Sequence, residues 1–336
     1  MNETTQATQA NPAGDSAERV FQAVSSPHLS NTAFTTRRMM ADVLIALIPL
    51  VLVSVIVFGM YAVIQLAICL ISCLAAEAVF TALRKKPVTL SDGSAAITAI
   101  ILALSLPATA PWYVGVIASV VGIGIGKVIF GGLGMNIFNP AMVGRAFVMI
   151  SFAGSMAASG YLDDGSTVDV MTMATPLTAF KQGGEVTPLM NLIIGTTNGS
   201  LGEVSAIACL LGGVYLCLRR TASWEIPAGV IATTIILGGL ADIVGAGSAW
   251  SVWHHLFGGA LLFGAFYIAT DPVTTPLTPR GKWIFGIGVG AIIMLLRVFS
   301  GYPEGVMFAV LLMNALTPLI NRWTIPRPFG DTGKQE

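Results

Sequence analysis

The sequence predicts an all-α membrane protein, a polytopic bundle of transmembrane helices built as an inverted repeat with broken helices. Three observations predict it: the composition, apolar runs of span length, and two similar stretches interrupted by proline. Hydrophobic residues make up 54% of the chain and charged residues 10%, with a mean hydropathy of +0.79. Soluble domains carry about 25% charged residues, so this composition excludes that class. The runs lack the alternation of a membrane β-barrel.

The apolar runs recur from one end of the chain to the other. A helix rises about 1.5 Å per residue and the hydrocarbon core is about 30 Å thick, so about 20 apolar residues cross once. Roughly ten spans are expected, some of them shorter or interrupted. In order they are Val43–Phe58, Tyr61–Leu83, Ser94–Leu106, Trp112–Phe130, Pro140–Met156, Val204–Leu218, Ile226–Leu240, Val252–Ala269, Trp283–Phe299 and Gly305–Ile320. The membrane domain is predicted to cover residues 37–321, between an N-terminal tail, residues 1–36, and a C-terminal tail, residues 322–336.

Basic residues at span ends predict the orientation, because Lys and Arg mark the cytoplasmic side. The clusters that border the spans are Arg37-Arg38, Arg84-Lys85-Lys86, Arg219-Arg220, Arg280 with Lys282, and Arg322 with Arg327. Alternating ten spans from a cytoplasmic N-terminus places all of them inside. Both tails are therefore predicted to be cytoplasmic, and the mostly acidic loop 157–203 to face the outer side.

Two stretches, Gly93–Gly134 and Gly258–Gly301, share a proline break, a glycine-rich run and a basic residue followed by valine. We interpret them as a gene duplication whose copies have opposite orientations on the predicted topology. The breaks, Leu106–Pro111 and Thr270–Pro276, free backbone groups that need protein, water or a ligand. Inverted repeats of interrupted helices commonly bracket a binding site near the bilayer midplane. An ordinary turn is the alternative for each break.

Ionisable residues within apolar runs are costly and commonly functional. Glu77 and Arg145 lie deepest in their runs, so they are candidates for ion coupling or for a structural buried pair. The run Gly122–Lys127 lacks the spacing and the following Ser or Thr of a nucleotide-binding loop, and predicts close helix packing. Lys127 is expected to reach the cytoplasmic interface. The four cysteines are expected in the core, and no metal site is predicted.

The heptad Asp169–Thr175, followed by Pro176-Leu177, lies in the polar loop. On the residues alone, an ordinary loop is the favoured interpretation. A phosphoester linkage would need a hydroxyl on an accessible segment, and Thr175 supplies one. Pro176 disfavours helix at the residue before it, which keeps Thr175 extended.

The chain resembles the family of the D subunit of Rnf complexes and the B subunit of the sodium-pumping NADH:quinone oxidoreductase. The resemblance covers nearly everything after the N-terminal tail, and its most specific block is Gly131–Met142. The other motifs that carry it are Ser25–His28, Arg37–Met40, Ser91–Gly93, Leu106-Pro107 with Ala110–Trp112, the heptad, and Ala269–Val273. The modest length and short N-terminal tail favour the Rnf branch.

The resemblance implies that a flavin transferase joins the phosphate of FMN to the hydroxyl of Thr175. Asp169, Thr172, Ala174 and Thr175 match the family heptad, whereas Val170 and Met173 depart from it. The resemblance also implies a second, noncovalent flavin, riboflavin, in the membrane interior. The two breaks and the Gly131–Met142 block are the predicted pocket, with Asn139, Pro140 and Asp271 as its candidate residues.

The function that the resemblance implies is that of one subunit in an ion-translocating ferredoxin:NAD oxidoreductase of the bacterial cytoplasmic (inner) membrane. Electron transfer would be coupled to Na+ or H+ transport. Implied partners are an outer subunit with its own covalent FMN, iron–sulfur subunits and an NADH-binding subunit; nucleic acid is not expected. No residue is assigned as catalytic, and the chain alone is expected to be inactive. The alternatives are a secondary transporter or channel, and an assembly scaffold with an unmodified Thr175.

Overall fold

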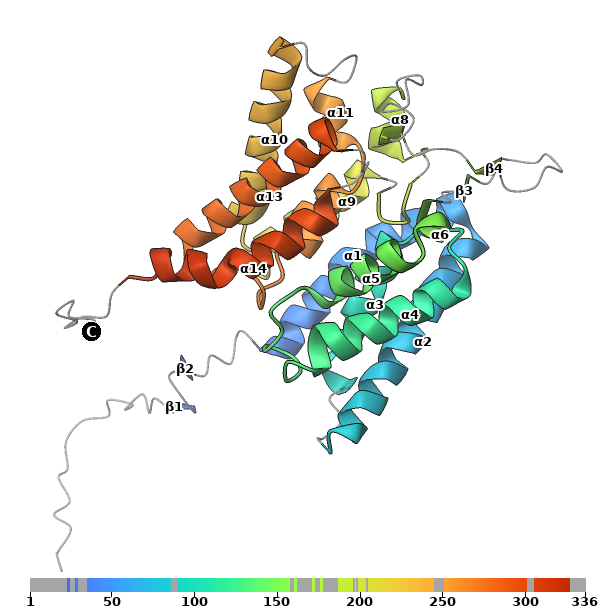
Figure 1. The fold of residues 1–336 in the computed structure, drawn as a ribbon, viewed down its shortest axis with the longest axis vertical. Coiled ribbons are helices and arrows are strands. Elements are labelled where there is room, and N and C mark those ends of the chain that lie inside the picture. The colour runs from blue at the N-terminus through green and yellow to red at the C-terminus, as the bar shows by residue number, and fades with distance from the viewer. Residues whose placement is uncertain are drawn as a thin grey trace, which may run out of the picture. The chain divides into compact units, whose positions relative to one another are not determined.

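The computed structural model describes residues 23–24, 28–29, 35–85, 90–157, 160–161, 171–172, 176–177, 187–195, 197, 199–203, 205–244, 251–300 and 305–326. The chain divides into two units, Met1–Thr35 and Thr36–Glu336. In the first unit, β1 (Ala23–Val24) pairs with β2 (His28–Leu29) as an antiparallel ribbon. All the helices described below belong to the second unit (Figure 1).

The first half of the second unit contains five main helices. They are α1 (Thr36–Phe58), α2 (Met60–Leu83), α3 (Ser94–Ser105), α4 (Trp112–Ile123) and α5 (Pro140–Ser151). A short 3-10 turn, η1 (Leu90–Asp92), precedes α3, and α4 continues into a π-helical turn, η2 (Gly124–Val128). The connection to the second half holds α6 (Ala153–Ala157), the paired strands β3 (Gly160–Tyr161) and β4 (Met171–Thr172), and α8 (Leu189–Ile194).

The second half has a corresponding series of helices. They are α9 (Ala206–Leu218), α10 (Glu225–Val244), α11 (Val252–Phe257), α12 (Leu261–Phe263), α13 (Pro279–Phe299) and α14 (Val306–Thr324). The short α12 continues into a second π-helical turn, η3 (Gly264–Ile268). We treat α11, α12 and η3 as one broken element.

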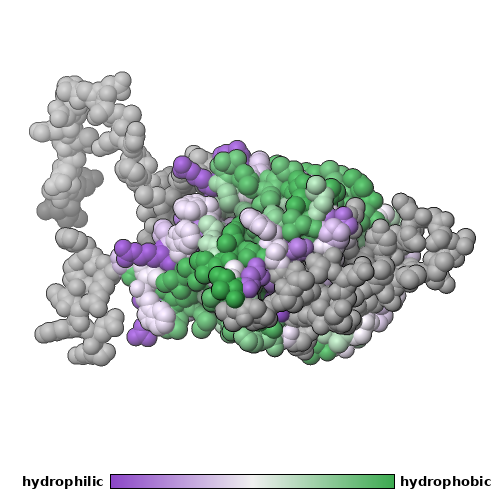
Figure 2. All heavy atoms as spheres, turned by 90° about the horizontal axis from the view of Figure 1, so that it is seen from above, coloured by the Kyte–Doolittle hydropathy of each residue, from purple (hydrophilic) through white to green (hydrophobic). Residues whose placement is uncertain are grey.

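Five helices are long and apolar enough to cross a membrane: α1, α2, residues Glu225–Ile243 of α10, α13 and α14. Shorter apolar helices cover Ser94–Ser105, Trp112–Val128, Pro140–Ser151 and Ala206–Leu218. Large apolar side chains face outward, as a lipid-facing surface requires, and Phe299 is 83% exposed. Figure 2 shows apolar residues over broad areas of the described surface. These features confirm the all-α polytopic membrane fold, whereas the number of crossings stays a prediction.

The order of helix packing is similar in the two halves. In the first, α2 packs against α3 and α4, and α4 packs against α5. In the second, α10 packs against α11 and α13, and α13 packs against α14. The halves meet where α1 packs along α9, and Figure 1 shows them as two neighbouring groups of helices. This similarity supports the predicted duplication, and the opposite orientation of the copies remains a prediction.

Glycines bring α4 and α5 into close contact, as the sequence predicts. A Cβ atom at Gly144 would lie 2.3 Å from the carbonyl oxygen of Ala118. A Cβ atom at Gly122 would lie 2.7 Å from the carbonyl oxygen of Pro140, and one at Gly126 would lie 2.9 Å from the Pro140 Cα. Small residues allow such backbone approach between membrane helices. The glycine-rich run therefore serves helix packing.

The predicted span Val252–Ala269 is not one continuous helix. It is interrupted between α11 and α12, where Gly259 has a φ of +70° that favours glycine. Arg297 of α13 donates hydrogen bonds to the carbonyl oxygens of His255 and Gly258. Because these carbonyls lie at the end of α11, the guanidinium supplies partners that a continuing helix would have supplied.

Candidate functional site

A cavity lies between the two halves, beside both π-helical turns. Its empty space, part of which is open to solvent, is about 820 Å³. The first half contributes residues of α1, α3, η2, the segment before α5 and the start of α5. The second half contributes the end of α9 and the residues just after it, η3, and the break that follows η3.

The cavity lining is mostly apolar with a few polar groups. Its lining residues are Met39, Met40, Val43, Ser94, Ile97, Thr98, Ile101, Lys127, Leu133, Asn136, Asn139, Pro140, Ala141, Leu216, Thr221, Ala222, Tyr267, Thr270, Asp271, Pro272 and Val273. Buried polar groups placed among apolar walls orient a ligand and give specificity. This lining is therefore suited to a mostly apolar organic molecule that carries a few polar groups.

Asn139, Pro140 and Asp271, predicted for one pocket, all line this cavity. The Asn139 Oδ1 atom caps α5 by accepting hydrogen bonds from the backbone of Ala141 and Met142, and its Nδ2 atom donates to the carbonyl of Ile268 at 3.2 Å. This side chain thus joins the start of α5 to η3 in the other half. These contacts of Asn139 shape the cavity wall.

Asp271 also organises backbone locally. Its carboxylate accepts hydrogen bonds from the backbone N–H of Val273 and the hydroxyl of Thr274, each at 3.3 Å, so it holds the turn after η3. The nearby Asn136 is buried and donates to the carbonyl of Phe138. Asn136 also lines the cavity and belongs to the Gly131–Met142 block predicted for the pocket, although it was not one of the individual candidate residues.

The other predicted break, Leu106–Pro111, does not line this cavity. Leu106 lies beyond the last residue of α3, whereas Ser94, at the start of that helix, lines the cavity. The carbonyls freed near the break accept hydrogen bonds from the backbone, Leu201 donating to Leu106 and Gly202 to Leu104. The break is therefore satisfied by protein.

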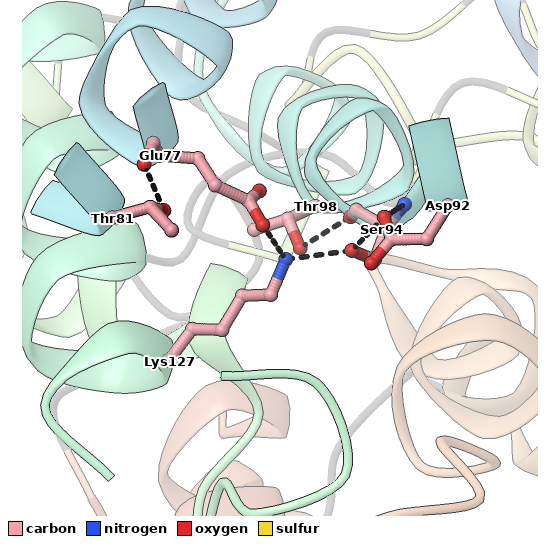
Figure 3. A network of polar contacts seen from close by, with 6 residues as sticks. All are labelled: Glu77, Thr81, Asp92, Ser94, Thr98 and Lys127. Atoms are coloured by element: carbon pink, nitrogen blue, oxygen red, sulfur yellow. Dashed lines mark hydrogen bonds and ion pairs between the residues drawn. The ribbon is translucent and has the colours of Figure 1, made fainter. Parts of the chain in front are cut away.

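Lys127 reaches the cavity from η2 and is 2% exposed. The prediction that it extends to the membrane interface is wrong, because its ammonium binds Glu77 Oε1 at 2.7 Å and Ser94 Oγ at 2.6 Å. Ser94 in turn donates to Asp92 Oδ1 at 2.6 Å, and Thr98 donates to the Ser94 carbonyl at 3.0 Å (Figure 3). A buried ammonium requires such partners, since desolvating it is costly.

Glu77 and Arg145, predicted for ion coupling or for a buried pair, are both buried. The ion pair of Glu77 is with Lys127, from α2 to η2, and Thr81 also donates to the Glu77 carbonyl. Arg145 is buried in α5. The role of the two residues in ion coupling remains a prediction.

A second polar cluster joins α1 to the end of α9 next to the cavity. The Asp42 carboxylate accepts hydrogen bonds from Tyr215, Arg219 and Thr221, each at 3.2 Å. Asp42 is buried, and Thr221 also lines the cavity. This cluster fixes the contact between the first helices of the two halves.

The heptad is only partly visible. Asp169, Ala174 and Thr175 lie outside the described residues. Thr172 lies in β4, paired with Gly160 of β3, and Pro176 precedes the buried Leu177. Among the described residues, no group of three or more His, Cys, Asp or Glu side chains could hold a metal ion.

The fold and the cavity define a class: a polytopic helical membrane protein whose two similar halves enclose a cavity at broken helices. The chain belongs to the NQR2, RnfD, RnfE family, whose model matches residues 22–330. It is 42% identical over 312 residues to the D subunit of the Na(+)-translocating ferredoxin:NAD(+) oxidoreductase complex of Acetobacterium woodii, an alignment that covers 92% of this chain and 95% of that protein.

Two other relatives are similar to nearly the same extent. The D subunit of the proton-translocating ferredoxin:NAD(+) oxidoreductase complex of Clostridium ljungdahlii is 39% identical, with 93% of this chain and 97% of that protein covered. The D subunit of the ion-translocating oxidoreductase complex of Actinobacillus succinogenes is 38% identical, with 93% and 98% covered. The similarity therefore spans almost the whole of each protein.

Proposed function

We propose that this chain is the membrane D subunit of an ion-translocating ferredoxin:NAD oxidoreductase complex of the bacterial inner membrane. The observation that carries the proposal is the similarity to D subunits of such complexes over 92–93% of the chain. The subunit relays electrons within the complex and is inactive alone. Its partners are an outer subunit with covalent FMN, iron–sulfur subunits and an NADH-binding subunit, and both of its termini are cytoplasmic.

The proposed electron carrier of the outer loop is FMN joined through its phosphate to Thr175. Support comes from the heptad, in which Asp169, Thr172, Ala174 and Thr175 match the family pattern, and from Pro176, which disfavours helix at Thr175. When bound, the flavin supplies the electron chemistry, and the chain supplies a hydroxyl for attachment and the surroundings of the ring.

The first test is the modification of Thr175 itself. The chain is expressed with a flavin transferase and partner subunits, denatured, and examined by ultraviolet fluorescence on a gel and by peptide mass spectrometry. We expect an FMN-sized adduct in wild type and in Thr178→Ala, a threonine outside the heptad, and none in Thr175→Ala. An unmodified Thr175 in wild type would remove the covalent carrier and favour an assembly scaffold, or a transporter or channel.

We also propose that the cavity holds a noncovalent flavin, riboflavin. Its residues fit the group: Met40 and Ile97 offer apolar surfaces, and Asn136 and Thr270 offer polar atoms to the edge of a ring. Ile97→Trp should fill the space and abolish the flavin released by denaturing the purified complex. Ile71→Trp is the matched control, because Ile71 is 67% exposed on α2 and lies outside the cavity lining.

Glu77 and Arg145 remain the proposed ion-coupling residues. Glu77 is buried in the ion pair next to the cavity. There, a change of charge would strongly alter the electrostatic energy of neighbouring ionised groups, because solvent screens it little. We expect Glu77→Gln to reduce the number of Na+ or H+ ions transported per NADH while electron transfer persists. The measurement is ion uptake by vesicles containing the complex, and an unchanged ratio in both Glu77→Gln and Arg145→Gln would contradict the assignment.

A further inference from the structure

Lys127 connects a buried carboxylate with the cavity. Its Nζ atom is 2.7 Å from Glu77 Oε1 and 2.6 Å from Ser94 Oγ, and Lys127 itself lines the cavity. An ammonium carries three N–H donors. Since two of them have partners among the described residues, one donor is left for a molecule in the cavity.

Burial strengthens the electrostatic interactions of the pair. The Lys127 and Glu77 side chains are 3% and 2% exposed, so solvent screens them little. Ser94 fixes the ammonium from a second side. Asp92 orients Ser94, because its Oδ1 atom accepts hydrogen bonds from the Ser94 backbone N–H at 2.8 Å and from the Ser94 hydroxyl at 2.6 Å (Figure 3). A cation held in place in this way stabilises negative charge that develops beside it, and its surroundings need not reorganise.

We propose that the positive charge of Lys127 stabilises a cavity ligand that gains an electron. The carboxylate of Glu77 partly neutralises that positive charge. The inference rests on the proposed noncovalent flavin. One electron, delivered by the partner subunits, adds one negative charge to the ligand, and no bond is formed or broken at Lys127. The new charge and the Glu77 carboxylate then share the same ammonium.

Substitutions at the two positions should therefore shift the midpoint potential of the noncovalent flavin in opposite directions. Lys127→Gln removes the favourable positive charge, so the reduced flavin should bind at least tenfold more weakly relative to the oxidised flavin. For a one-electron couple this corresponds to a potential lowered by about 59 mV. Glu77→Gln removes the competing negative charge and should raise the potential. Lys127→Arg keeps the charge and should stay near wild type.

Arg297 offers a matched control from the other half. It is also a buried cation that binds an element of the bundle, through the carbonyls of His255 and Gly258, but it does not line the cavity. We expect Arg297→Gln to lower thermal stability without moving the flavin potential. A purely structural role for Lys127 would give the same result at Lys127→Gln.

The experiment is a redox titration of the purified complex, followed by absorbance, together with the amount of flavin released on denaturation. Opposite shifts in Lys127→Gln and Glu77→Gln support the inference, whereas flavin that stays bound with an unshifted potential in both overturns it. If Lys127→Gln does not assemble, the double variant Lys127→Gln/Glu77→Gln, compared with Glu77→Gln alone, measures the same loss of charge. Wild-type complex without noncovalent flavin would refute the flavin site itself, and with it this inference.

Discussion

The contact between α4 and α5 can be tested with a single methyl group. In Gly144→Ala, the added Cβ atom would lie 2.3 Å from the Ala118 carbonyl oxygen and 3.1 Å from its carbon, whereas ordinary contacts begin at 3.4 Å. The helices must separate by about 1 Å to admit it, and overpacking of this kind typically costs about 1–3 kcal/mol. One kcal/mol shifts the unfolding temperature of a domain of about 150–250 residues by about 2–4 °C, and that of a longer chain by less, so we expect a fall of at most about 12 °C.

The assay is the apparent unfolding temperature of the purified chain in detergent, followed by tryptophan fluorescence at one heating rate. Gly154→Ala is the control, because a Cβ atom at Gly154 in α6 would meet no atom within 4 Å. There, the substitution should be neutral or slightly stabilising. Equal unfolding temperatures for the two variants would refute the close approach. Since η2 and the start of α5 form walls of the cavity, Gly144→Ala should also retain less noncovalent flavin.

Three further outcomes are expected, each measured on the purified chain in detergent. Lys127→Met should cost about 3–5 kcal/mol of stability in thermal or denaturant unfolding, because it leaves a buried carboxylate without its cation; adding Glu77→Gln should recover most of the loss. Asp42→Ala should lower the unfolding temperature more than Arg219→Ala, since the buried carboxylate accepts three side-chain hydrogen bonds while the Arg219 side chain is 40% exposed. A maleimide should modify Cys217 of the folded chain before the other three cysteines, which are buried, as mass spectrometry of timed samples will show; equal rates would contradict the packing.

Much of the fold follows from local patterns in the sequence. Apolar runs predicted the helices because burial in lipid requires apolar side chains and internally satisfied backbone. Proline and glycine predicted the breaks near Pro107 and Pro272, and the Gly122–Lys127 run predicted close packing of helices. These features depend on neighbouring residues, so they can be read without knowing the tertiary structure. The interruption at Gly259 was missed, since its stabilising partner, Arg297, is far along the chain.

The candidate site was predictable in part. Asn139 and Asp271 were expected in one pocket and line one cavity, although they are more than a hundred residues apart. The partner of Glu77 was missed because Lys127 lies 50 residues away and the pairing depends on how each helix is rotated about its axis. A lysine within a run predicted to cross the membrane was the available signal. Lys127 was expected to extend to the cytoplasmic interface. An acidic residue in a neighbouring span, however, gives such a lysine a partner in the protein interior.

The two π-helical turns restrict how the sequence can change in length. Each contains one residue that forms part of the cavity wall, Lys127 in η2 and Tyr267 in η3. A π-helical turn contains one residue more than an α-helical turn, so deleting one residue from either turn would convert it to α-helix and change how Lys127 or Tyr267 faces the cavity. Insertions and deletions accumulated during evolution should therefore be confined to connections such as residues 157–203, while residues 112–128 and 261–268 keep a constant length.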